Sequence, residues 1–170
     1  MRLSMAYPRV LRITHLMSCS FAPREAPMKR VALVTLVVDD YDEAIRFYTE
    51  ALGFRLAEDT PRPDGSRWVV VEPDTGGHGT GLLLARAKDE SQRGRVGDQT
   101  GGRVGFFLHT DDFARDHARM TAAGVTFLED PRHETYGSVV VFQDLYGNRW
   151  DLLQPAAPDP QPAASDETAQ

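Results

Sequence analysis

The sequence predicts an α+β protein made of two copies of one βαβββ module. Two observations lead to this prediction: strand and helix patterns occur twice in the same order, and the residues that begin and end those elements recur at a nearly constant spacing. Because a single module cannot cover both faces of its four-stranded sheet, we expect the two copies to pack side by side. Together they would form a curved mixed sheet around a cavity, with the helices on the outer face.

The first module spans residues 29–88. Residues 31–38 (VALVTLVV) form a continuous apolar and β-branched run, which predicts a buried strand. Asp39 or Asp40 then supplies a helix N-cap, and Gly53 ends a helix whose apolar residues lie on one stripe. Turns rich in proline and glycine separate three further expected strands, at residues 54–58, 67–72 and 81–86.

The second module spans residues 103–154 and follows a polar, glycine-rich segment, residues 89–102, which we interpret as a flexible linker. Residues 104–108 are expected to form its first strand, and the helix after it should run over residues 113–123, with Asp111 or Asp112 as its N-cap. The module therefore repeats the order of elements of the first.

The repeat itself is visible in aligned residues. A shift of 71 positions places Asp40 on Asp111 and Gly53 on Gly124. A shift of 70 then places residues 69–71 (VVV) on 139–141 and Leu82-Leu83 on Leu152-Leu153. Chance gives a few such matches, but not in one register with the same order of elements, so we infer a duplicated module.

The two ends of the chain, residues 1–28 and 155–170, are expected to be disordered extensions. Arg9 and Arg12 interrupt any apolar segment of a secretory signal, and the last residues are rich in proline, alanine and acids. Since Met28 directly precedes the first strand, the sequence leaves the start of translation open among Met1, Met5, Met17 and Met28.

Composition restricts the partners of the protein. The chain has 170 residues, of which 41% are hydrophobic and 26% charged, and a formal net charge of -6, without the clustered Lys and Arg that nucleic acids and anionic membranes require. No apolar run reaches the roughly 18 residues of a membrane span. Cys19 is the single cysteine, which excludes an internal disulfide and fits a reducing cytoplasm. We expect a cytoplasmic protein without nucleic-acid or membrane partners.

Residues 143–154 (QDLYGNRWDLLQ) combine a hairpin turn with a two-faced strand. Strand alternation places Trp150 and Leu152 on the core side and points Arg149 and Asp151 to the opposite face. An acid on a sheet face is unusual for an ordinary core, which makes Asp151 a candidate functional residue.

Two segments resemble the vicinal oxygen chelate superfamily, which includes glyoxalase I, the bleomycin resistance proteins and the extradiol dioxygenases. They are residues 37–53 (VVDDYDEAIRFYTEALG) and residues 142–152 (FQDLYGNRWDL). The resemblance covers about residues 29–154 and implies paired βαβββ modules that close over a U-shaped cavity, commonly completed by a homodimer. The frame serves both metal enzymes and metal-free binding proteins, so it indicates the fold better than the chemistry.

Metal-dependent members of this superfamily hold a divalent ion with four side chains, one from the first and one from the last strand of each module. The corresponding positions here are Leu33, Gly81, one of Arg103, Val104 and Gly105, and Asp151. Only Asp151 can coordinate a cation, whereas useful sites supply three or more ligands. We therefore expect no cofactor, with a divalent metal as the weaker alternative, and disfavour classical metal-dependent glyoxalase or dioxygenase activity.

Several residues are candidates for ligand contact. Arg103 could pair with a substrate carboxylate or with Asp151, His133 lies in a loop similar to the cavity rim of the family, and Trp68 and Tyr136 could line the cavity. Alternatively Asp151 pairs with Arg149 on a solvated surface. The complete set of predicted ligand-binding residues is Leu33, Thr35, Trp68, Arg103, Phe106, His133, Tyr136, Arg149 and Asp151. His117, in the middle of a helix, is expected to face solvent.

Three functions follow from these features. The leading hypothesis is a metal-free glyoxalase-like or bleomycin-resistance-like protein that binds a small, partly apolar organic molecule. The second is a lyase or isomerase that uses Asp151 as general base, with Arg103 or His133 as electrophile, next to a carbonyl. The third is a resistance protein that sequesters an antibiotic and needs no catalytic group.

Overall fold

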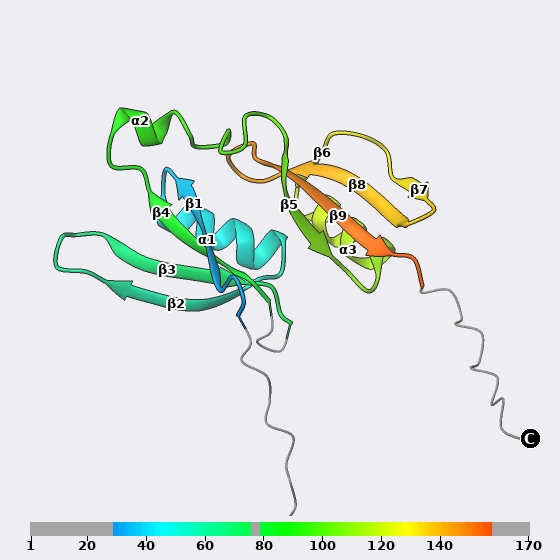
Figure 1. Ribbon diagram of the computed structural model, residues 1–170, viewed down its shortest axis with the longest axis horizontal. Coiled ribbons are helices and arrows are strands. Elements are labelled where there is room, and N and C mark those ends of the chain that lie inside the picture. Colours follow the sequence, from blue (N-terminus) through cyan, green and yellow to red (C-terminus); the bar gives the residue numbers. More distant parts are fainter. Residues whose placement is uncertain (1–28, 76–78, 158–170) are drawn as a thin grey trace, which may run out of the picture. The chain divides into compact units, whose positions relative to one another are not determined.

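The computed structural model describes residues 29–75 and 79–157, in which the strands and helices form two consecutive modules (Figure 1). The first has the order βαβββ, and the second has the same order except that the strand after its helix is divided into two short strands, which pair with the same neighbour. The predicted α+β class and the duplicated module are confirmed. The extension predicted at residues 1–28 and most of the predicted tail, residues 158–170, lie outside the described residues.

The first module forms a four-stranded sheet in the order β1-β4-β3-β2, in which β1 and β4 are parallel and the other neighbours antiparallel. The Asp40 side chain caps α1 by accepting hydrogen bonds from the backbone N–H groups of Asp42 and Glu43. The elements are β1 (Leu33–Val38), α1 (Tyr41–Arg46), the π-helical turn η1 (Phe47–Ala51), β2 (Arg55–Pro61), β3 (Arg67–Glu72) and β4 (Gly81–Arg86).

The second module forms a sheet in the order β5-β9-β8-β6, and β7 pairs with β8 beside this path. The segment predicted as a linker contains the short helix α2 (Glu90–Arg93), and β9 reaches Pro155, the first residue of the predicted tail. The other elements are β5 (Val104–His109), α3 (Phe113–Ala122), β6 (Thr126–Phe127), β7 (Arg132–Glu134), β8 (Gly137–Gln143) and β9 (Arg149–Pro155). Each sheet carries a helix on one face (Figure 1).

In the part of the chain that the structure describes, the ladders of hydrogen bonds form two sheets, whereas the sequence predicted one curved sheet. Gln99 gives a physical reason, because its side-chain amide satisfies the outer edge of β1. The Gln99 amide accepts a hydrogen bond from the Val37 N–H at 2.9 Å and donates one to the Thr35 carbonyl at 2.7 Å, as a neighbouring strand would.

One hydrophobic core receives residues from both modules. Trp150 is 3% exposed, which confirms its predicted core position. Its ring stacks on Phe106 at 4.4 Å between centroids and lies 6.1 Å from the ring of Tyr48 in η1. Aromatic contacts of this kind bury much apolar surface and fix the relative orientation of the rings.

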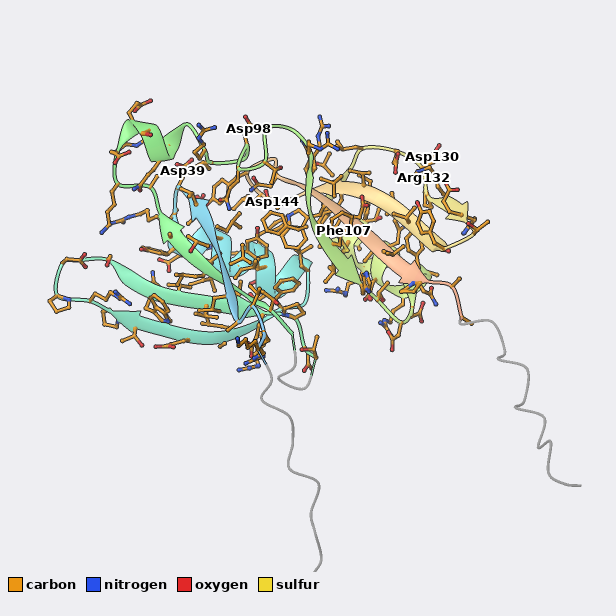
Figure 2. The ribbon with its side chains drawn as sticks, viewed as in Figure 1. Asp39, Asp98, Phe107, Asp130, Arg132 and Asp144 are labelled. Carbon is orange, nitrogen blue, oxygen red and sulfur yellow. The ribbon has the colours of Figure 1, made fainter. Side chains whose placement is uncertain are left out.

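Asp144, in the turn between β8 and β9, is the polar centre of the contact between the modules (Figure 2). Its buried carboxylate accepts five hydrogen bonds, including those from the Tyr48 hydroxyl at 2.8 Å and the Trp150 indole N–H at 3.3 Å. Burial, with the nearby Asp144 charge, raises the pKa of Tyr48 well above its usual value, so its hydroxyl remains a donor. Two residues of the family-like segments thus hold the modules together.

Arg119 provides a second contact between the modules. Its guanidinium donates hydrogen bonds to the Ala51 carbonyl at 3.1 Å and the Leu52 carbonyl at 3.0 Å, the unpaired acceptors at the end of η1. The positive charge of the guanidinium also interacts favourably with the negative end of the helix dipole. This contact fixes α3 against the helical turn of the first module.

Candidate functional site

Asp151 lies in the middle of the second sheet, on the face opposite to Trp150. In the register of the sheet its neighbours are Phe107 on β5 and Val141 on β8. Residues paired across neighbouring strands point to the same face. Phe107, labelled in Figure 2, is 63% exposed, so a large apolar ring stands in solvent at the register position beside Asp151. We call the surface formed by Phe107, His109, Val141, Asp151 and Leu153 the Asp151 face.

The carboxyl group of Asp151 has no polar partner within the described residues. Its Oδ1 atom is buried without a hydrogen bond, and none of the ion pairs in the described part of the chain includes it. Burial raises the pKa of Asp151, the charge of Arg132 lowers it, and that of Glu129 raises it further. The pairing with Arg149 considered from the sequence is therefore not formed.

Arg132, on β7, lies on the same side of the sheet as Asp151, because it pairs with Val139, which in turn pairs with Leu153. Its guanidinium is already occupied: Nε donates to a carboxylate oxygen of Glu129 at 3.0 Å, and Nη1 donates to one of Glu134 at 2.9 Å. The guanidinium whose charge lowers the pKa of Asp151 is thus already paired with two other carboxylates.

Several predicted site residues lie elsewhere. Phe106 faces the core against Trp150, because a bulge at Gly105 shifts the register so that Phe107 meets Asp151. For the same reason Phe107, and not Arg103, Val104 or Gly105, occupies the position beside Asp151.

His133 does not share the face of Asp151. It belongs to β7, a strand that the sequence did not predict, and it pairs with Ser138, whose hydroxyl lies 2.9 Å from His133 Nδ1. Alternation along β7 therefore turns His133 away from the side that carries Arg132. His117 was expected to face solvent but packs against Phe127, with 4.3 Å between ring centroids.

The remaining predicted residues are distributed over both sheets. Leu33 is 37% exposed and pairs with Gly81, and the Trp68 ring is covered by the Arg62 guanidinium at 4.6 Å. Thr35 meets Gln99 through its backbone. In the second sheet, Arg149 shares the face of Asp151 by alternation, and Tyr136 is 53% exposed.

The four positions where related metal enzymes carry ligands do not fit a metal ion in this chain. In the sheet registers Leu33 pairs with Gly81 and Phe107 with Asp151. Whether the third position is Phe107 or one of the predicted Arg103, Val104 and Gly105, Asp151 is the one side chain of the four that can coordinate a cation. Across residues 29–75 and 79–157, no group of three or more His, Cys, Asp and Glu side chains is arranged to hold a metal. We therefore derive no chemistry through a metal.

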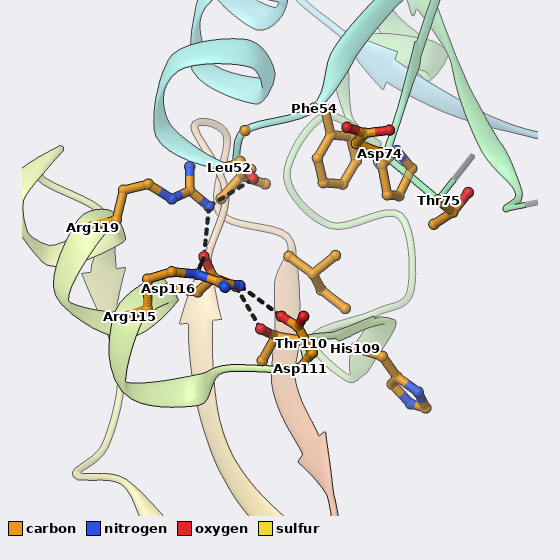
Figure 3. Close-up of a pocket in the computed structure, with 13 residues that line it drawn as sticks. Leu52, Phe54, Asp74, Thr75, His109, Thr110, Asp111, Arg115, Asp116 and Arg119 are labelled. Carbon is orange, nitrogen blue, oxygen red and sulfur yellow. Dashed lines mark hydrogen bonds and ion pairs between the residues drawn. The ribbon is translucent and has the colours of Figure 1, made fainter. Parts of the chain in front are cut away.

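A depression of about 330 Å³ lies where α3 approaches residues 52–54 (Figure 3). The charged groups that α3 contributes already bind other residues: Arg115 pairs with Asp111 at 2.7 Å and with Asp116 at 3.0 Å, and Arg119 caps η1. These contacts identify the depression as part of the junction between the modules, so the Asp151 face remains the better candidate site.

Comparison with known proteins agrees with this architecture. The family model for the Glyoxalase/Bleomycin resistance protein/Dioxygenase superfamily matches residues 30–152. The chain belongs to this superfamily. An uncharacterized protein of Shewanella frigidimarina (strain NCIMB 400) is 54% identical over 122 residues, which cover 71% of this chain and 90% of that protein. YurT of Bacillus subtilis (strain 168) is 30% identical over 129 residues, 74% of this chain and 98% of YurT.

Solved structures of the superfamily show the same fold. TnmS3, an antibiotic binding protein from Streptomyces sp. CB03234, has a TM-score of 0.61 and 31% identity and covers 77% of this chain and 99% of its own. UcmS2 has a TM-score of 0.64 and 30% identity, with coverages of 75% and 98%. In the described part of the chain, no helix is both long and apolar enough to cross a membrane.

Proposed function

We propose that this superfamily member binds a small organic molecule on the Asp151 face without the help of a metal. The observation that carries the proposal is the pair formed by Phe107 and Asp151: an exposed aromatic ring directly beside a partly buried carboxyl group that has no partner. Small-molecule sites combine apolar surface with a few polar groups that fix orientation, and this pair offers both.

A second copy of the chain would complete the site. The Asp151 face is open on the single chain, and Leu33 of the first sheet is exposed as well as Phe107. A homodimer that covers these side chains would remove apolar surface from water and enclose a ligand. Light scattering of the full chain should then give twice the mass of 18.9 kDa, whereas a monomer at micromolar concentration contradicts this part of the proposal.

Antibiotic sequestration is the physiological form of this function that the comparisons favour. TnmS3 is described as an antibiotic binding protein, and this chain aligns with nearly all of it. Sequestration needs affinity and no catalytic group. It predicts that protection of cells grows in proportion to the amount of protein and that the antibiotic is recovered chemically intact.

A fragment screen by nuclear magnetic resonance tests the proposed site. Binding in the presence of EDTA should shift the amide signals of Phe107, Asp151 and Leu153. Phe107→Ala should weaken it about tenfold or more, since a buried aromatic ring contributes well over 1 kcal/mol. Leu145→Ala, at an exposed leucine in the β8–β9 turn, is the matched control.

Two results would contradict the proposal. Fragments that bind at the junction between the modules, and not at the Asp151 face, contradict the proposed site. Stoichiometric Mn²⁺, Ni²⁺, Fe²⁺ or Zn²⁺ binding that Asp151→Ala abolishes contradicts metal independence.

A lyase or isomerase remains the second candidate, because burial raises the pKa of Asp151 toward the range useful to a general base. This alternative predicts that a bound carbonyl compound is converted and that Asp151→Asn stops the conversion while binding persists. Product analysis after incubation separates it from sequestration.

A further inference from the structure

We infer that the ligand of the Asp151 face carries a strong hydrogen-bond donor, preferably a protonated amine, about one strand spacing from a flat apolar or aromatic ring. This inference rests on the proposed function, because it names the chemical class that the same site selects. It follows from three features of the site: an unpartnered carboxylate, an arginine that is already neutralised, and an exposed ring.

The first feature is the unsatisfied carboxyl group of Asp151. One oxygen is inaccessible to water and accepts no hydrogen bond, while the side chain as a whole is only partly buried, so its second oxygen remains accessible on the open face. A carboxylate that has lost part of its hydration gains most from a donor that carries positive charge. A ligand donor on the accessible oxygen would supply this missing interaction.

The second feature is the local balance of charge. Arg132 forms ion pairs with Glu129 and Glu134, so two carboxylates already compensate the charge that it presents to Asp151. A ligand carboxylate beside Arg132 would therefore meet three acidic groups around one guanidinium, which disfavours anionic ligands through like-charge repulsion. A cation meets little repulsion from Arg132, because that guanidinium is already paired; the other arginine on this face, Arg149, lies two residues before Asp151 on β9.

The third feature is the ring of Phe107. It is the register neighbour of Asp151 on the adjacent strand, and neighbouring strands lie about 4.8 Å apart. A ligand whose ring packs on Phe107 thus places a group one or two bonds away over the carboxylate. Val141, on the other side of Asp151, extends the apolar surface.

Four naphthalene probes of equal ring size test the inference: 2-naphthylmethylamine, 2-naphthol, 2-methoxynaphthalene and 2-naphthoate. In titrations of the full chain at neutral pH, their affinities should decrease in that order. The amine should bind at least about tenfold tighter than the methoxy compound, the usual effect of a hydrogen bond to a charged group. Asp151→Asn should abolish the advantage of the amine, and Phe107→Ala should weaken all four probes.

The outcomes separate the inference from the proposed function. If all four probes bind at the Asp151 face with similar affinity in the wild type and in Asp151→Asn, the face binds ligands but the donor requirement is wrong. If none of them shifts Phe107 or Asp151, both the inference and the proposed function fail. Asp98→Asn, at an exposed aspartate of the segment before β5, should leave the ranking unchanged. Circular dichroism spectra confirm that each variant is folded.

Discussion

Replacement of Asp144 by asparagine should destabilise the protein more than most single substitutions. The side chain is 5% exposed, and its two oxygens accept hydrogen bonds from both modules. One oxygen receives the Tyr48 hydroxyl, the Asn148 amide and the Trp150 indole, and the other receives the backbone N–H groups of Tyr146 and Asn148. An asparagine offers only one acceptor oxygen, so whichever way its amide turns, an NH₂ group faces at least two donors.

The expected loss follows from these bonds. A hydrogen bond to a charged acceptor contributes about 1.5–3 kcal/mol, so two lost bonds correspond to about 3–6 kcal/mol, similar to the roughly 3–5 kcal/mol lost when one partner of a buried ion pair is removed. Proteins of this size usually have about 5–15 kcal/mol of stability in total. The melting temperature should therefore fall by on the order of 10 °C.

Chemical denaturation followed by tryptophan fluorescence measures this change directly, because Trp150 donates to Asp144. Tyr48→Phe removes one donor and should cost about 1–2 kcal/mol, while Asp98→Asn makes the same chemical change on the surface and should stay within about 0.5 kcal/mol. The double variant of Asp144 and Tyr48 should be less destabilised than the sum of the two single variants. An Asp144→Asn protein as stable as the wild type would refute the role of this carboxylate.

Three further predictions concern single residues. Gly137→Ala should cost about 1–3 kcal/mol in thermal unfolding, because Gly137 has φ of 143° and an added Cβ would lie 2.1 Å from the Gln154 carbonyl oxygen; an unchanged melting temperature contradicts this. Gln99→Ala should speed amide hydrogen exchange at Val37, since that N–H loses its acceptor; unaltered exchange contradicts the role of Gln99 at the β1 edge. Asp151→Asn should be more stable than the wild type at pH 7 but not at pH 3. Burial raises the pKa of Asp151 in the folded state above its value in the unfolded state. The free energy of unfolding of the wild type, relative to that of Asp151→Asn, is therefore highest below about pH 4 and falls as the pH rises through the folded-state pKa. A difference in stability between the two proteins that does not depend on pH contradicts this.

The order of elements could be predicted because it depends on local patterns and on the repeat. The strands at residues 67–72 and 81–86 have the predicted bounds, and the Asp40 cap is formed as expected. The π-helical turn η1 could not be predicted, since residues 47–51 match an ordinary helix equally well. Its conformation accompanies long-range contacts, the Tyr48 hydroxyl on Asp144 and the Arg119 cap on Ala51, which no local pattern contains.

The candidate site was predicted less completely than the fold. Asp151 was found from strand alternation alone, but the first-strand position matched with it was expected at Arg103, Val104 or Gly105, two to four residues before Phe107. Gly105 was the available signal, because a glycine inside a strand often marks a bulge that changes which side chains face the core. Arg132 was missed because the short strand β7 has no alternating apolar pattern, and only its pairing with β8 defines which way it points.

Amide chemical shifts of the full chain in the presence of 2-naphthylmethylamine and EDTA give the most direct test of ligand binding without a metal. The account predicts saturable shifts at Phe107, Asp151 and Leu153, and both Phe107→Ala and Asp151→Asn should raise the amine concentration needed to reach saturation about tenfold or more. Shifts confined to other parts of the protein, or shifts at these residues that appear only when a divalent metal is added, would contradict it.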